Sequence, residues 1–130
     1  MNDRLSQVFA LREDFMQRIC KNIPGAYPDW PVDLGVKDNQ KAIREFAFRG
    51  MEELFEALLH LKNWKDHRDG TGDFDREEFL EEMIDAYNYF TAILVLLGVD
   101  ADEFFSAYTR KHEIICNRLD NEKSSRKVND

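Results

Sequence analysis

Residues 39–65, NQKAIREFAFRGMEELFEALLHLKNWK, decide the fold, because they contain no proline and carry apolar side chains at steps of three and four residues. Such steps place side chains on one face of an α-helix. We therefore predict one long helix over this range, capped by Asp38 or Asn39. Its core face is expected to consist of Ile43, Ala47, Met51, Leu54, Leu58 and Leu61.

Two acidic side chains border this core face. Glu53 and Glu56 are three residues apart and fall on one stripe beside the apolar residues, whereas Glu52 points away. A further apolar side, which would be exposed in a simple monomeric hairpin, holds Phe48, Phe55 and Leu59. That side predicts helix packing or a dimer interface.

Three more helices are expected outside this segment. The first covers residues 3–22, and the prolines and glycine that follow, beginning with Pro24, end it. Another begins after Asp75 and stops at Gly98, and the last runs from Asp100 to about Leu119. Residues 121–130 are expected to form a flexible tail. The sequence therefore predicts one all-α domain over residues 1–130, an antiparallel helical bundle of four main helices that assembles as an oligomer.

The helix after Asp75 repeats the acidic pattern. Glu82 and Asp85 adjoin its predicted core stripe, which consists of Phe79, Met83, Ala86, Tyr87, Phe90, Leu94 and Leu97. If the two long helices pack antiparallel, both acidic pairs converge, and four carboxylates at close range cannot all stay ionised without a cation. Oxygen ligands favour Mg²⁺, with Mn²⁺ as a substitute. We therefore predict a metal site that binds a phosphoanhydride substrate.

The composition restricts the classes of partner. The chain has 130 residues and a formal net charge of −8, unlike the broad basic surface of a duplex-binding protein. No apolar stretch approaches the ~20 residues that span a bilayer, so we expect no nucleic-acid or membrane partner and a cytoplasmic location. Cys20 and Cys116 lie far apart with no CxxC pattern, so both are expected to be buried free thiols.

The order of the acidic motifs resembles that of a known family. Glu53-Leu-Phe-Glu56 followed by Glu82-Met-Ile-Asp85 looks like the ExxE and ExxD motif pair of the all-α NTP pyrophosphohydrolase superfamily, which includes MazG-like enzymes and dimeric dUTPases. The resemblance covers the chain from residue 4 to about residue 121.

Flanking elements are similar to the dUTPase branch of that superfamily. Lys62 and Trp64 stand where the branch carries a KxW element, and RLSQVFALRE resembles its first helix. Lys111 and Arg118 are similar to the Lys and Arg of its terminal helix. The resemblance implies that these four residues bind substrate, with phosphate contacts from Lys111 and Arg118. Read from the helices alone, Trp64 could equally be an aromatic at the core edge, and the two cations could be solubilising.

The resemblance implies an enzyme that hydrolyses a nucleoside triphosphate to its monophosphate and pyrophosphate. Mg²⁺ would be held by Glu53, Glu56, Glu82 and Asp85, with Glu53 or Glu56 activating the water. The expected substrate is dUTP, and the alternative is a MazG-like diphosphatase acting on dCTP, dATP, dGTP or damaged nucleotides. The assembly would be a homo-oligomer, with a dimer favoured and a tetramer possible.

Some positions depart from the dUTPase pattern. Arg12 stands where a Gln is common, Ile115 where an Asn is usual, and Leu119 where a Gln often follows the Arg. These departures weaken the expectation that the enzyme selects uracil over other bases. An alternative from another class is a non-catalytic helical module that binds nucleotide or metal. Tyr27 and Trp30 are either packing anchors or part of a nucleotide lid, and sequence leaves both roles open.

Overall fold

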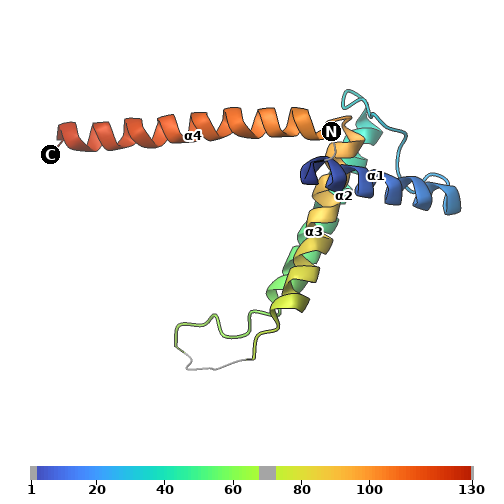
Figure 1. Ribbon diagram of the computed structural model, residues 1–130, viewed down its shortest axis with the longest axis horizontal. Helices are drawn as coiled ribbons and strands as arrows, with labels where there is room; N and C mark the ends of the chain where they lie inside the picture. The colour runs from blue at the N-terminus through green and yellow to red at the C-terminus, as the bar shows by residue number, and fades with distance from the viewer. Residues whose placement is uncertain (1–2, 68–72, 130) are drawn as a thin grey trace.

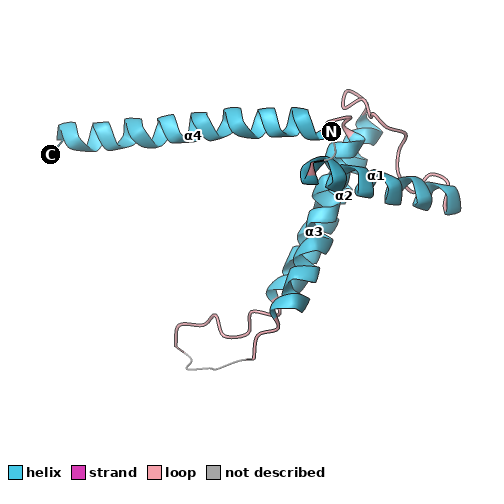
Figure 2. Ribbon diagram, in the orientation of Figure 1, coloured by secondary structure: helices cyan, strands magenta, loops and turns pink. Residues whose placement is uncertain are grey.

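The computed structural model describes residues 3–67 and 73–129 and contains four α-helices and no strand among those residues (Figure 2). The helices are α1 (Arg4–Asn22), α2 (Lys37–Leu58), α3 (Arg76–Leu96) and α4 (Ala101–Asn129). Figure 1 shows α2 and α3 side by side as an antiparallel hairpin, α1 crossing one end of it, and α4 leaving that end in another direction. The predicted all-α class with four helices is confirmed, and the packing of α1, α2 and α3 against one another is consistent with a bundle.

Aspartate side chains start three of the helices. Asp3 Oδ1 accepts the backbone N–H of Ser6 at 2.8 Å, Asp75 Oδ1 that of Glu78 at 3.1 Å, and Asp100 Oδ1 that of Glu103 at 2.8 Å. Each bond satisfies a backbone donor that has no partner within the helix. The predicted starts after Asp75 and Asp100 are therefore confirmed.

A positive-φ glycine ends α3. Gly98 has φ 76°, and the backbone N–H of Val99 donates to the carbonyl of Leu94 at 3.0 Å. The N–H of Gly98 donates to the carbonyl of Val95 at the same distance. This pair of bonds is a Schellman motif, which closes a helix and turns the chain away. The predicted stop at Gly98 is therefore confirmed.

The bounds of α2 differ from the prediction of residues 39–65, since α2 begins at Lys37 and ends at Leu58. Neither Asp38 nor Asn39 caps it; the Asn39 side chain instead donates to the carbonyl of Asp33 at 3.0 Å, bracing the turn before the helix. At the other end, the N–H groups of residues 59–61 donate to carbonyls three residues back, so the last turn tightens and the α-helix stops.

The end of α4 also differs from the prediction. The helix continues to Asn129, beyond the expected stop near Leu119 and through most of the predicted tail. No Gly or Pro interrupts residues 101–129, and the segment is rich in residues that favour helix. Cys116, expected to be buried, is exposed on α4, whereas Cys20 is half-buried. Within the described residues, every helix falls short of the length and apolar character that a membrane span requires.

The core lies where α1 and the loop after it pack on the hairpin. It consists of the buried residues Met16, Tyr27, Phe46, Ala92, Val95 and Leu96. The ring of Tyr27 stacks on Phe46 at 5.1 Å between centroids, and Trp30 Nε1 donates to Glu13 Oε1 at 3.2 Å. Tyr27 and Trp30 are therefore packing anchors of the loop, and Tyr27 also lines a cavity between α1 and α3.

The face that α2 turns toward α3 is rotated from the predicted core stripe. Phe46, Gly50 and Ala57 are buried, whereas Met51 and Leu58, both predicted as core, are 44% and 43% exposed. Small side chains let two helix backbones approach closely, so Gly50 and Ala57 belong to this interface. On α3, Ala86, Ala92 and Leu96 are likewise buried while Tyr87 is 63% exposed. The predicted exposure of Phe48, Phe55 and Leu59 is confirmed.

Candidate metal and nucleotide site

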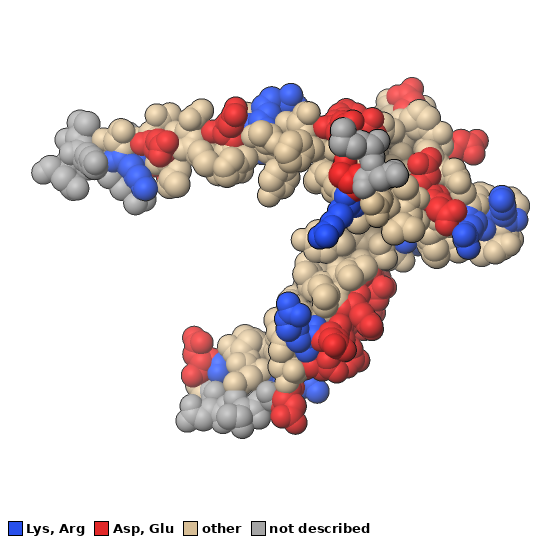
Figure 3. Space-filling model, viewed as in Figure 1, with Lys and Arg blue, Asp and Glu red and all other residues tan. Residues whose placement is uncertain are grey.

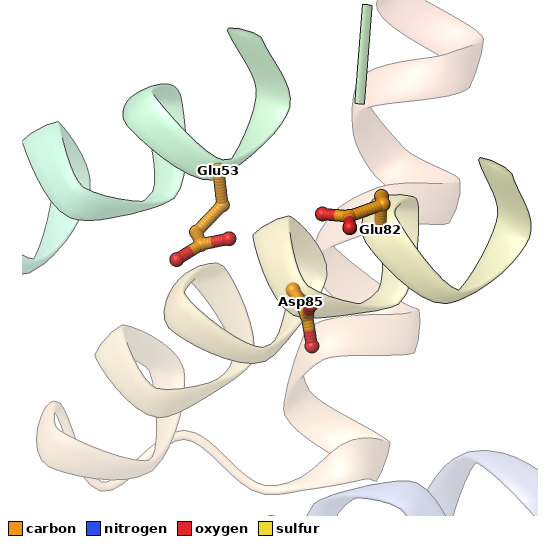
Figure 4. A group of neighbouring side chains, drawn as sticks. All are labelled: Glu53, Glu82 and Asp85. Carbon is orange, nitrogen blue, oxygen red and sulfur yellow. The ribbon is translucent and has the colours of Figure 1, made fainter. Parts of the chain in front are cut away.

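Three carboxylates meet between α2 and α3. Glu53 comes from α2, and Glu82 and Asp85 come from successive turns of α3 (Figure 4). One carboxylate oxygen from each lies within 4.8 Å of the other two. Glu53 and Glu82 are half-buried and Asp85 is exposed. The structure thus brings together three of the four residues predicted as metal ligands.

Gly50 explains why the two helices come so close at this site. A Cβ atom built on Gly50 would stand 3.1 Å from Cζ of Phe90 and 3.2 Å from Cβ of Tyr89. Larger side chains would hold α2 and α3 further apart. Because Gly50 precedes Glu53 by about one helical turn, the close approach carries over to the carboxylates.

Glu56, the fourth predicted ligand, is exposed and stands beside Glu53 without joining the three-residue cluster. Its effect is visible in the pKa of Glu53, which is raised above the ordinary 4.5. Burial is the largest cause, followed by the charge of Glu56 and a side-chain hydrogen bond with it, then by the charges of Asp85 and Glu82. Figure 3 shows acidic side chains gathered along one edge of the hairpin. The carboxylates of this cluster repel one another, and binding of either a proton or a cation relieves the repulsion.

A cavity of about 790 Å³ adjoins the carboxylates, with Glu53 and Asp85 in its wall. Its other walls come from α1, the loop after α1, and α3. They are mostly apolar or aromatic and include Val8, Leu11, Phe15, Tyr27, Ile84, Asn88 and Tyr89. A mixed wall of this kind, apolar with a few polar groups, is typical of a small-molecule site.

Arg12 is the one cation among the residues that line this cavity. Its guanidinium stands 4.6 Å from the ring centroid of Phe15, and Nη2 donates to the Tyr27 hydroxyl at a long 3.4 Å. Arg12 Nε is buried and has no hydrogen-bond partner. The guanidinium therefore has an N–H donor without a hydrogen-bond partner. Its positive charge is opposite to the charges of Glu53 and Asp85 in the same cavity wall.

The contribution of α1 to the site was missed by sequence reasoning, which predicted the helix but gave its apolar residues no part in the site. Val8, Leu11 and Phe15 follow one another at steps of three and four residues, and all three are exposed at the cavity. That spacing marks a second apolar stripe, beside the buried Phe9 and Met16. A second stripe on a short helix was the signal available in the sequence.

Lys62 and Trp64 do not lie on the carboxylate stripe, because α2 has already ended at Leu58. They line a separate cavity of about 430 Å³ together with His60, Asn63 and Phe74. Trp64 is 71% exposed, and Lys65 Nζ stands 5.6 Å from the centroid of its ring. The predicted helical placement of these two residues is wrong, whereas their proposed contact with substrate stays a prediction.

Lys111 and Arg118 are exposed on α4 and stand apart from the carboxylates. Among the described residues, α4 contacts α1 but neither α2 nor α3. Figure 1 shows α4 leading away from the hairpin that carries the acidic cluster. Within one chain, these two cations therefore do not join the site.

Comparisons of this chain with protein-family models, curated proteins and solved structures give no match. The geometry of the residues and their pattern in the sequence therefore carry the functional argument.

Proposed function

We propose that the chain is a magnesium-dependent nucleoside triphosphate pyrophosphohydrolase, which converts a (d)NTP to its monophosphate and pyrophosphate. The observation that carries the proposal is the meeting of three carboxylates at the wall of a cavity of about 790 Å³. Sites for small organic ligands commonly have volumes of about 300–1,000 Å³, so a nucleotide fits this size. The resemblance of the two acidic motifs to the all-α superfamily supports the same activity.

The donor set suits Mg²⁺. All the donors are carboxylate oxygens, which Mg²⁺ prefers. The pKa of Glu53 is raised first by burial and then by the neighbouring carboxylates, and a bound cation would offset both effects. Oxygens bound to one Mg²⁺ lie no more than about 4 Å apart, because each bond is about 2 Å long. The observed limit of 4.8 Å is close to that spacing. Glu53, Glu82 and Asp85 would hold the ion, with Glu56 beside them.

The metal ion and the chain's own carboxylates would have separate roles in the reaction. Mg²⁺ would supply positive charge against the phosphate oxygens. Glu53 or Glu56 accepts a proton from a water molecule whose oxygen forms the new bond to the α-phosphorus, while the bond between the α-phosphorus and the bridging oxygen breaks and pyrophosphate leaves. No covalent intermediate with the protein is required.

The base is proposed to lie in the apolar part of the cavity, between α1 and α3. We place dUTP first, from the resemblance, and a MazG-like preference for dCTP, dATP, dGTP or a damaged nucleotide second. The second option rests on Arg12, which lines this cavity and stands where the dUTPase branch commonly has a Gln. Its guanidinium has only N–H donors, so it hydrogen-bonds acceptor atoms alone, whereas a Gln side chain donates and accepts. The phosphate contacts proposed for Lys111 and Arg118 require α4 of another copy, which fits the proposed homo-oligomer.

A nucleotide panel with product analysis tests the proposal. The purified chain, with Mg²⁺, is incubated with each common and deaminated (d)NTP, and monophosphate and pyrophosphate are measured. We expect release of both products in equal amounts from at least one nucleotide. Absence of pyrophosphate release from the whole panel contradicts the proposal.

Matched variants separate an enzyme from a non-catalytic module. Glu82→Gln and Asp85→Asn are expected to lower kcat by more than the roughly 10- to 100-fold that loss of an outer-shell partner costs, because each residue would bind the metal directly, and helicity should be unchanged. Glu52→Gln serves as the control, because Glu52 is an exposed neighbour of Glu53 outside the cluster. Nucleotide binding without turnover in the parent chain favours the module instead.

A further inference from the structure

Helix α4 carries a thiol beside an imidazole, away from the acidic cluster. Cys116 Sγ stands 3.5 Å from His112 Nε2, and both side chains are exposed. The two residues are four positions apart, so they lie on successive turns of one side of the helix. Thiolate sulfur and neutral imidazole nitrogen are both metal ligands. The exposed pair is therefore accessible to a metal ion from solvent, whereas the buried thiol that the sequence predicted would be inert.

The separation of the two donor atoms matches the requirement of a tetrahedral metal ion. Zinc binds sulfur at about 2.3 Å and imidazole nitrogen at about 2.0–2.1 Å, so at the tetrahedral angle the two ligand atoms lie about 3.5 Å apart. Sγ of Cys116 and Nε2 of His112 stand at 3.5 Å. The backbone that carries them is one uninterrupted helix, and donors mounted on a helix keep their spacing. Both atoms can therefore bind one ion without a change of fold.

The donor types select the metal. Thiolate and imidazole favour Zn²⁺ and ions of similar softness, whereas Mg²⁺ prefers oxygen ligands. The pair thus differs in chemistry from the cluster of carboxylates between α2 and α3. Glu113 stands three residues before Cys116, which makes the two side chains neighbours on the helix surface and offers a carboxylate as a third donor. A water molecule would complete the tetrahedron.

The pair also lies apart from the two cations of α4 that the proposed function uses. At about 100° per residue, His112 is about 100° round the helix from Lys111, and Cys116 is about 160° from Arg118. A metal ion on the pair therefore leaves uncovered the side of α4 that carries Lys111 and Arg118. Binding of the ion does not depend on nucleotide hydrolysis.

We propose that His112 and Cys116 bind Zn²⁺ or a similarly soft divalent ion, and that the bound ion stabilises the helical form of α4. Among the described residues of one chain, α4 contacts only α1, and Phe104 near its start provides one of these contacts, against Phe9. A helix without a packing partner is marginal in water. An ion that bridges two successive turns binds the helical form alone and so stabilises it. Cys116 releases its thiol proton to the solvent as the sulfur binds the ion, and neither partner changes oxidation state.

Titration of the reduced full chain with Co²⁺ tests the site, because cobalt bound to a thiolate has a sulfur-to-metal charge-transfer absorption that carboxylate complexes lack. We expect one such Co²⁺ per chain, displaced by Zn²⁺ and not by excess Mg²⁺. Cys116→Ala should abolish the absorption, and His112→Ala should weaken Co²⁺ binding at least about 10-fold. Two variants are controls and should leave the absorption unchanged: Cys20→Ala, at the half-buried thiol of α1, and Asp85→Asn, in the carboxylate cluster.

Hydrogen exchange of single amides tests the effect of the ion on α4. With Zn²⁺ at about ten times its Kd, amides of residues 110–118 should exchange about 10-fold more slowly in the parent, because opening of the helix there requires release of the ion. Exchange should not change in His112→Ala or with Mg²⁺ alone. A parent without the charge-transfer absorption overturns the proposal, as does an absorption that persists in Cys116→Ala or disappears in Cys20→Ala. Equal affinity of His112→Ala and the parent for Co²⁺, or exchange in α4 that Zn²⁺ leaves unchanged, overturns it as well.

Discussion

Gly50 of α2 lies directly against Phe90 of α3, so that a Cβ atom added to Gly50 would stand 3.1 Å from Cζ of the Phe90 ring. The same atom would stand 3.2 Å from Cβ of Tyr89, which is part of the α3 surface at the cavity. One helical turn further along α2, Glu53 meets the carboxylates of α3. Gly50 therefore determines both how close α2 and α3 lie and how close the carboxylates of the acidic cluster lie.

Replacement of Gly50 by valine should force α2 and α3 apart. We expect Gly50→Val to lower the free energy of unfolding by about 1–3 kcal/mol, the usual cost of an overfilled interface. Urea denaturation followed by circular dichroism measures the change. Lys41→Val, at an exposed position of α2, controls for the helix propensity of valine. A stability of Gly50→Val at or above that of the parent would mean that the helices are not in tight contact at Gly50, because valine favours helix more than glycine does.

The raised pKa of Glu53 predicts a pH-dependent stability in the absence of Mg²⁺. The folded state keeps this proton to a higher pH than the unfolded chain, whose Glu53 has the ordinary pKa of 4.5. The free energy of unfolding therefore falls as pH rises from the ordinary pKa through the raised one. Glu53→Gln cannot ionise, so we expect it to melt above the parent at about pH 7 and to lose that advantage below about pH 4. Thermal melts over this pH range, with Glu52→Gln as the control, check the prediction.

Magnesium should reverse the destabilisation that the clustered carboxylates cause. A cation bound only by the folded state stabilises it by about 2.7 kcal/mol at a concentration of 100 times its Kd. We expect the melting temperature of the parent to rise with millimolar Mg²⁺, that of Asp85→Asn to rise much less, and that of Glu52→Gln to follow the parent. A parent whose melting temperature is the same with and without Mg²⁺, in the presence of nucleotide as well, has no such site.

Local signals in the sequence predicted the fold where a short stretch of chain decides the outcome. Asp75, Asp100 and Gly98 act on backbone groups within a few residues, and each start or stop that they predicted is confirmed. The end of α2 was predicted too late because no Gly or Pro stands between Leu58 and Gly70 to mark it. The predicted core face of α2 is rotated from the observed one, because the prediction used the positions of the large apolar residues and left out Gly50, which is buried.

The site could be predicted only in the part that depends on one helix pair. Glu53, Glu82 and Asp85 meet because their positions on α2 and α3 follow from helical periodicity and antiparallel packing. The cavity beside them depends on where α1 crosses the hairpin, which no spacing within α1 specifies. The placement of Lys111 and Arg118 depends on the direction of α4, which the short turn at Gly98 sets in three dimensions.

Arg12 is expected to determine which base the cavity accepts. A hydrogen bond from a charged donor contributes about 1.5–3 kcal/mol, so Arg12→Ala should lower kcat/KM roughly 10- to 100-fold for the preferred nucleotide and much less for the others. The panel described above, repeated with the variant, measures this difference. Arg18→Ala is the control, since Arg18 is exposed on the same helix and pairs with Asp14 at 2.9 Å. A loss of equal size for every base would assign Arg12 to the phosphates.

Mixing two inactive variants tests whether Lys111 and Arg118 act on the site of another copy. We expect Arg118→Ala and Asp85→Asn to be inactive separately, because one lacks a phosphate contact and the other a metal ligand. If α4 serves the partner's carboxylates, a mixed dimer has one site with both defects and one site with none. Random re-assortment of a two-fold dimer then restores about a quarter of the parent activity. The mixture of Glu82→Gln with Asp85→Asn, whose defects lie in the same cluster, is the control and should stay inactive. Recovery in neither mixture would contradict a contribution of α4 to the carboxylate site of another copy.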